Sequence, residues 1–197
     1  MGVYKLSAAG GIATPRTNYS SFLAGNPKFV PPSYESIASA SGTGSSATIS
    51  FTSIPQTFTH LQIRGIAKPT VADGVIKLSF NGVTATTNYN IHGMNGNGST
   101  TSAFYENTSQ FIYGFANNVE TGDIYGAGVI DILDYTNTNK NRTTRALTGY
   151  DKNGSGDINL LSHLYRSTTA VTQIDLILNQ GNFTTGTRIA LYGIKGA

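Results

Sequence analysis

The 197-residue chain contains no cysteine, which excludes disulfides and thiolate metal ligands. Its stability therefore has to come from packing, from sheet hydrogen bonds or from assembly. Charged residues make up only 12% of the chain, about half of the usual quarter. Their place is taken by Thr, Ser, Asn and 23 Gly, residues that suit short turns and β-branched strands. This composition favours an all-β domain.

Long hydrophobic runs are also missing. The first eleven residues, MGVYKLSAAGG, hold no apolar run of signal-peptide length, and no later segment reaches the ~18 apolar residues of a membrane span. We therefore expect no Sec export and no membrane partner. The 13 Lys and Arg residues exceed the 10 Asp and Glu, but they are scattered without a basic block. We expect no sequence-specific binding of nucleic acid.

Apolar residues alternate with polar ones over most of the chain beyond residue 46. Leu61 and Ile63, for example, alternate with Gln62 and Arg64, which is the pattern of a half-buried strand. No helix of three turns is visible. The pattern predicts about nine or ten short strands between residues 47 and 194, at the turn spacing of a sandwich. We predict an antiparallel β-sandwich of the jelly-roll kind, with residues 46–197 as its domain.

Three connections carry more detailed predictions. Asn81 and Gly82 predict a tight hairpin, with residues 83–89 returning beside residues 76–80. Residues 171–193 contain two apolar runs around a polar turn, which predicts an antiparallel pair. Residues 88–110 are rich in Gly and Asn and poor in apolar residues, so they are predicted to form a long exposed loop.

Residues 1–45 differ from the rest of the chain. Prolines, a Gly pair and a Ser/Gly tract break every periodic pattern, and nothing here can build a core of its own. Apolar residues nevertheless recur, which is typical of an extended arm that lies along another surface. We predict such an N-terminal arm, and its partner-binding residues are Tyr4, Leu6, Tyr19, Phe22, Leu23, Phe29 and Tyr34.

Catalytic signals are missing from the sequence. His60, His92 and His163 are the only histidines, and none belongs to a metal-binding or triad motif. We expect no enzymatic activity and no cofactor.

One segment resembles the start of a calcium loop. Asp151, Asn153 and Ser155 supply side-chain oxygens at alternate positions, Gly156 follows, and Asp157 adds a carboxylate. Position twelve is Ser162, where the motif needs a bidentate Glu. The alternative interpretation is a hairpin turn around Asn153 and Gly154.

Aromatic residues offer a second candidate site. The chain has eleven Tyr and nine Phe but no Trp. Tyr89, Phe104 and Tyr105, near the predicted 88–110 loop, could form a platform for a receptor or glycan, with Tyr113 beside them. Tyr is equally common as a strand residue at the edge of a core, so both interpretations stay open.

Both ends of the chain resemble small virion structural proteins of tailed bacteriophages. The resemblance lies in residues 18–39 (NYSSFLAGNPKFVPPSYESIAS), 49–65 (ISFTSIPQTFTHLQIRG) and 180–196 (QGNFTTGTRIALYGIKG). It covers a third to a half of the chain, leaves residues 70–157 unmatched and implies an all-β particle component without catalytic residues. The expected location is the virion, assembled in the host cytoplasm.

Two functions follow as hypotheses. In the first, the chain is a capsid decoration or cement protein, with the sandwich on the particle surface and the arm on neighbouring subunits. The expected state is a homo-oligomer, a trimer, in contact with other virion proteins. In the alternative, the chain is a tail or fibre appendage that binds a host receptor or surface glycan.

Overall fold

The computed structural model describes residues 33–116 and 123–196. Within these ranges the protein is an all-β antiparallel sandwich, as predicted. A single turn of 3-10 helix, η1 (Thr86–Asn88), interrupts the strands. The strands are β1 (Tyr34–Ser41), β2 (Thr48–Phe51), β3 (His60–Ala67), β4 (Ile76–Phe80), β5 (Tyr89–Gly96), β6 (Thr101–Asn107), β7 (Phe111–Ile112), β8 (Gly126–Leu133), β9 (Arg142–Asp151), β10 (Gly156–Tyr165), β11 (Ile174–Leu178) and β12 (Arg188–Ile194).

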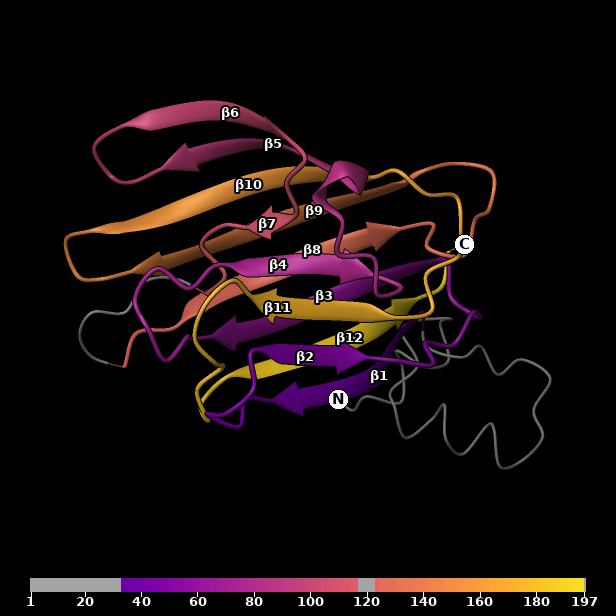
Figure 1. The fold of residues 1–197 in the computed structure, drawn as a ribbon, viewed down its shortest axis with the longest axis horizontal. Helices are drawn as coiled ribbons and strands as arrows, with labels where there is room; N and C mark the ends of the chain where they lie inside the picture. Colours follow the sequence, from indigo (N-terminus) through magenta and orange to yellow (C-terminus); the bar gives the residue numbers. More distant parts are fainter. Residues whose placement is uncertain (1–32, 117–122, 197) are drawn as a thin grey trace, which may run out of the picture. The chain divides into compact units, whose positions relative to one another are not determined.

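Two sheets of unequal size form the layers of the sandwich (Figure 1). The larger sheet has eight strands in the order β1-β12-β3-β8-β9-β10-β5-β6, and the smaller has four in the order β2-β11-β4-β7. The chain passes repeatedly from one sheet to the other, so strands that follow each other in sequence often lie in different layers. The jelly-roll topology stays a prediction.

The hydrophobic core lies between the sheets. Leu61 and Ile63 of β3 face the core from the larger sheet, and Leu78 and Leu176 face it from the smaller one, all nearly without solvent exposure. Period-two alternation puts these side chains on one face and polar neighbours on the other. Burial of this apolar area, at roughly 25 cal/mol per Å², is the main force that holds the layers together.

The predicted pairing of residues 171–193 is wrong. β11 pairs with β2 and β4, whereas β12 pairs with β1 and β3, so the two strands belong to different sheets. The connection between them crosses the sandwich, and the ring of Phe183 is fully buried within it. A buried aromatic side chain in the connection favours crossing between layers over a tight surface turn.

The predicted hairpin after residue 80 is also wrong. Asn81 and Gly82 do form a turn with positive φ angles of 53° and 72°, but only Phe80 and Val83 pair across it. The chain then enters η1 and joins the other sheet as β5. The hydroxyl of Tyr89 donates to the carbonyl of Val83 (2.7 Å) and accepts from the backbone N–H of Phe80 (3.0 Å), which ties the crossing together.

Residues 88–110 form the hairpin β5–β6 rather than the predicted exposed loop. β5 pairs with β10 on one side and with β6 on the other. The turn is closed by Asn97, whose Oδ1 accepts backbone hydrogen bonds from Ser99 and Thr100. The Gly and Asn residues that suggested a loop therefore sit within a regular ladder or its turn.

Residues 34–45, which the sequence assigned to the arm, belong to the compact unit that contains both sheets, and the arm itself stays a prediction. Strand β1 pairs with β12 from Tyr34 to Ser41, with a register shift between Ser36 and Ala38. The Ser and Ala residues that obscured its periodicity fit an edge strand, since only one face of it touches the core. No helix in the described part of the chain is long and apolar enough to cross a membrane.

Candidate functional site

Strands β5 and β6 extend the larger sheet beyond β7, the edge of the smaller sheet (Figure 1). The inner face of β5, β6 and β10 therefore lacks an opposing strand at this end. A pocket of about 310 Å³ opens beneath it. Its lining residues come from both layers: Val75, Asn95, Ser102, Phe104, Glu106, Tyr113, Gly114, Asp157 and Asn159.

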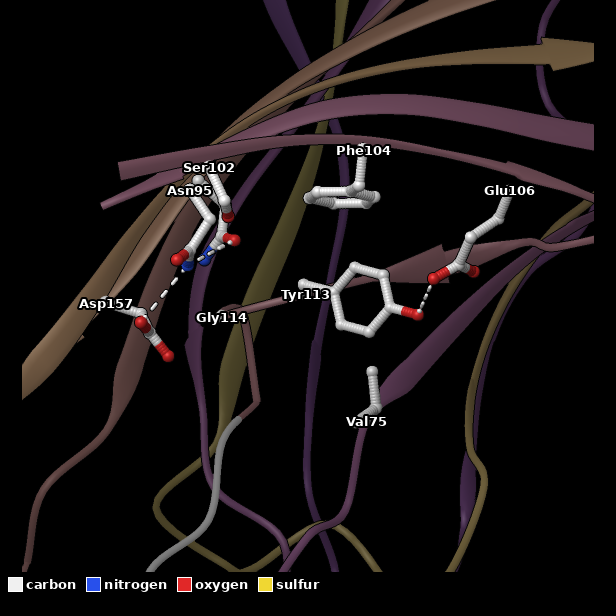
Figure 2. A pocket seen from close by; sticks show the side chains of 9 residues that line it. Val75, Asn95, Ser102, Phe104, Glu106, Tyr113, Gly114 and Asp157 are labelled. Carbon is white, nitrogen blue, oxygen red and sulfur yellow. Dashed lines mark hydrogen bonds between the residues drawn. The ribbon is translucent and has the colours of Figure 1, made fainter. Parts of the chain in front are cut away.

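Two aromatic rings form the apolar part of this inner pocket (Figure 2). The rings of Phe104 and Tyr113 meet edge to face, with centroids 5.7 Å apart and planes at 83°. The Tyr113 hydroxyl donates a 2.7 Å hydrogen bond to Oε1 of Glu106. Burial, followed by the nearby Glu106 carboxylate, raises the pKa of Tyr113, so the phenol stays a neutral donor.

A glycine sets the position of Phe104. The ring of Phe104 on β6 lies over Gly93, its partner residue on β5. A Cβ at residue 93 would lie 2.5 Å from Cζ of Phe104 and 2.9 Å from Cδ2 of Leu161. Only glycine leaves room for the ring against the sheet.

Amide and carboxylate groups form the polar part of the pocket. The Nδ2 of Asn95 donates to Oδ1 of Asp157 and to Oδ1 of Asn159, both at 3.1 Å. The Tyr150 hydroxyl donates to the second oxygen of Asp157 at 2.8 Å. These bonds fix the amide orientations, so the remaining polar atoms have defined directions in the pocket.

The charge of the pocket has one sign. Among the described residues, its lining includes two carboxyl groups and no Lys, Arg or His. Each carboxylate already accepts a hydrogen bond from a neutral donor. An anionic ligand would meet repulsion here, whereas a neutral polyhydroxyl compound would find donors, acceptors and ring surface together.

The opposite face of the same strands carries exposed apolar side chains. Ladder registers place Met94, Leu160, Leu147 and Val129 directly opposite one another across β5, β10, β9 and β8. Three of them are 52–59% exposed. Ile158, which is 60% exposed, and Ile66 lie in the adjacent row. We call this set of six residues the apolar face: Ile66, Met94, Val129, Leu147, Ile158 and Leu160.

Charges of both signs border the apolar face. Arg145 of β9 lies opposite Asp131 of β8 in the next row of the ladder, and Arg64 continues the row of Val129. Four strands at a spacing of ~4.8 Å give the apolar row a width of roughly 14 Å. Contiguous exposed apolar surface of this kind marks interaction sites in proteins.

The three predicted aromatic residues occupy three different environments. Tyr89 is buried in the core, where it stacks on Tyr165 at 4.9 Å, and burial raises its pKa to about 12. Phe104 lines the inner pocket, as does the neighbouring candidate Tyr113. Tyr105 lies on the outer face of β6, is 66% exposed and stacks on His92. The structure therefore does not bring these residues together into one platform.

The calcium candidates form a hairpin turn between β9 and β10. Oδ1 of Asp151 accepts the backbone N–H of Asn153, and Lys152 N–H donates to the carbonyl of Ser155. The carboxylate of Asp157 accepts hydrogen bonds from Tyr150 and Asn95. This arrangement is that of the alternative hairpin interpretation, and calcium binding stays a prediction. The described residues contain no group of three or more acidic or histidine side chains placed for a metal ion.

The arm candidates are mostly beyond the described part of the chain. Tyr4, Leu6, Tyr19, Phe22, Leu23 and Phe29 lie outside the described residues, and their role stays a prediction. Tyr34 belongs to β1, where its ring stacks on Tyr192 at 5.0 Å and its hydroxyl donates to Gln62. Its contacts in the structure are therefore within its own sheet.

The three histidines do not form a common site: His92 and His163 lie on the paired strands β5 and β10 but face opposite sides of the sheet, and His60 lies on β3. His163 is buried on the inner face of β10, between the carbonyl of Phe111 (2.9 Å) and the hydroxyl of Thr144 (3.2 Å). A carbonyl only accepts, so Nε2 carries the proton, and burial lowers the pKa of His163 to about 4. His60 accepts the backbone N–H of Asp134, and His92 stacks on Tyr105.

Sequence reasoning missed the polar half of the pocket. Asn95, Ser102 and Glu106 lie in the segment that was predicted to be a loop. The sequence did contain a signal for Asn159, because the apolar residues of segment 157–165 switch from even-numbered to odd-numbered positions along the strand. Ile158 and Leu160 alternate in one phase, and Leu161 and Tyr165 in the other.

Comparisons with known proteins add no relative to this geometry: no family model, no curated protein and no solved structure matches the chain. The functional argument therefore starts from the inner pocket and the apolar face.

Proposed function

We propose that the chain is a non-catalytic structural protein of a virion, of the capsid decoration or cement type. In this proposal the sandwich packs against a second copy of the chain through the apolar face. The observation that carries the proposal is the contiguous exposure of Met94, Leu160 and Leu147 on a sandwich with few charges. The resemblance of both chain ends to phage virion proteins supplies the biological setting.

The energetics of the apolar face support a covered state. Full burial of a Leu, Ile, Val or Met side chain stabilises a protein by about 1.5–3 kcal/mol relative to exposure. Six such side chains, partly exposed in one continuous area, therefore leave a substantial driving force unused in the single subunit. A subunit that is assembled into a particle gains this stabilisation when a neighbouring subunit covers its apolar face.

The bordering charges favour a copy of the same chain as the occupant. Arg145 and Asp131 sit side by side at the border of the apolar row, so the border presents both signs. A neighbouring copy in reversed orientation can meet each charge with its opposite, whereas a uniformly acidic or basic partner would meet repulsion from one of them. The trimer and the contacts of the predicted arm, residues 1–45, with neighbouring subunits stay predictions.

A structural role also agrees with the internal use of reactive side chains. His163 is neutral and buried, and Asp157 and Glu106 hold structural hydrogen bonds. The one hydroxyl–imidazole contact of His163 among the described residues is with Thr144 (3.2 Å), and both side chains are buried, so no substrate reaches this pair.

Immunogold electron microscopy of particles from the host culture would test the location. An antibody against residues 33–197 should label the capsid surface in a regular array. Label only at the tail tip would favour the appendage hypothesis instead. Free protein in the lysate together with unlabelled particles would contradict both virion roles.

A further inference from the structure

We propose that the inner pocket binds one neutral sugar residue. This inference is independent of the capsid role, because it depends only on the pocket beneath β5, β6 and β10. It also differs from the platform expected from sequence, since Tyr89 is in the core and Tyr105 faces the other side of the sheet.

The aromatic pair supplies an apolar contact of suitable shape. Phe104 and Tyr113, whose ring planes stand at 83° to each other, both line the cavity (Figure 2). A pyranose ring has an apolar side formed by its C–H groups, and such a side packs against aromatic rings. The 310 Å³ cavity lies at the small end of the ~300–1,000 Å³ range of ligand sites, which suits a single ring.

The polar groups match hydroxyls, which both donate and accept. Asn159 is only 3% exposed, and its Oδ1 is already occupied by Asn95. Its Nδ2 donates no hydrogen bond within the described ranges, so it is available as a donor. Glu106 keeps one carboxylate oxygen after accepting from Tyr113, and Asp157 keeps lone pairs on both oxygens.

These groups are fixed before a ligand arrives. Asn95 holds Asp157 and Asn159, Tyr150 holds Asp157 from the other side, and Tyr113 holds Glu106. Because their side chains are already ordered, ligand binding costs little additional conformational entropy. The two carboxylates, with no cation among the lining residues that the structure describes, select a neutral sugar over an acidic one.

Saturation-transfer NMR on the full 197-residue chain tests the proposal. The probes are the methyl glycosides of glucose, galactose, mannose and N-acetylglucosamine, with methyl glucuronide as the anionic comparison. At least one neutral glycoside should bind with a dissociation constant of about 1 mM, the range of weak single-ring contacts. The glucuronide should bind at least about tenfold more weakly, because its carboxylate is repelled by the two carboxylates of the pocket.

Three variants assign the binding to the pocket. Phe104→Leu should weaken binding by about fivefold through loss of ring contact. Asp157→Asn and Glu106→Gln keep the side-chain shapes and should each weaken it by about tenfold or more. Tyr105→Ala is the matched control, because it removes an aromatic ring from the opposite face of the same strand and should leave the affinity unchanged.

Several results would overturn the proposal. They are lack of binding by every neutral glycoside at tens of millimolar, affinity unchanged in both Phe104→Leu and Glu106→Gln, loss of binding in Tyr105→Ala, or preference for the glucuronide. Thermal unfolding of each variant identifies one that fails to fold, and the remaining variants still decide the outcome. Oligomeric state and particle labelling are separate readouts, so failure of sugar binding leaves the structural role standing.

Discussion

Two strands of the larger sheet, β3 and β10, place their apolar side chains on opposite faces. In β3, at the covered part of the sheet, Leu61 and Ile63 face inward and are fully buried, while Arg64 faces outward. In the first half of β10 the order is reversed, with Asn159 inward and Leu160 outward. The ladder from β9 through β10 to β5 is continuous, so no bulge produces this reversal.

The difference shows what each part of the sheet contacts. Where the smaller sheet covers the larger one, the inner face is apolar because another protein layer lies against it. Where that cover ends, the inner face becomes polar and forms a pocket, while the outer face becomes apolar. Such a reversal fits a region whose stable contacts lie outside its own chain.

Substitutions on the two faces of β9 should give the largest difference in the free energy of unfolding. Arg142 faces inward without solvent exposure, and its guanidinium donates to the carbonyls of Lys140, Thr168 and Thr169. Arg142→Met leaves these acceptors without partners and should lower the free energy of unfolding by about 3 kcal/mol or more.

Arg145→Met, on the outer face of the same strand, is the control and should change the free energy of unfolding by less than about 0.5 kcal/mol. Urea unfolding measures both variants. Equal losses would show that the two faces of β9 do not differ as described.

A pH titration tests the buried histidine of β10. The pKa of His163 is lowered to about 4 in the folded protein from 6.5, so the unfolded chain binds more protons between these values. Stability should therefore be full above about pH 6.5 and fall as the pH decreases towards 4, by roughly 3 kcal/mol at 1.36 kcal/mol per pH unit.

Substitution His163→Gln should flatten this part of the stability curve. The measurement is urea unfolding at a series of pH values from about 4 to 8, a range that covers the folded and the unfolded pKa of His163. A curve that keeps its slope in His163→Gln would contradict a buried neutral imidazole.

Two glycines of β5 provide a smaller contrast. Gly93 lies on the inner face beneath Phe104, and Gly93→Ala should cost about 1–3 kcal/mol by forcing the ring away. At Gly96, on the outer face, an added Cβ would meet only ordinary contacts at 3.5 Å and 3.9 Å. Gly96→Ala should change stability by less than about 0.5 kcal/mol. Thermal unfolding of both variants should show this difference, and equal melting temperatures would argue against close packing of Phe104.

Sequence patterns predicted the covered part of the fold and failed at the uncovered end. Leu61 and Ile63 were identified correctly because a buried inner face produces period-two hydrophobicity. In β5, Gly93 and Asn95 face inward, so the apolar alternation disappears and the segment was interpreted as a loop. Sheet membership was also beyond local patterns, since the partners of β11 are set by a chain crossing that buries Phe183.

Of the four aromatic candidates from the sequence, Phe104 and Tyr113 line the pocket, whereas Tyr89 and Tyr105 do not. Phe104 and Tyr105 are neighbours in sequence, and only the register of β6 against β5 decides which of them faces the pocket. Asp157 was assigned to a calcium loop because its spacing from Asp151 was visible, whereas its contacts with Asn95 and Tyr150 depend on strand pairing. Contacts between residues that strand pairing brings together cannot be predicted from the spacing of those residues in the sequence.

Sedimentation velocity of the full chain and of the double variant Leu147→Lys/Leu160→Lys tests the central claim most directly. The wild-type chain should form oligomers whose population rises with concentration. The variant should remain monomeric with an unfolding free energy within about 0.5 kcal/mol of the wild type, because both leucines are exposed in the single subunit. The control Thr143→Lys, two rows from Leu147 and Leu160 on the same outer face, should assemble normally. Identical sedimentation of the wild type and the leucine variant would contradict assembly through the apolar face.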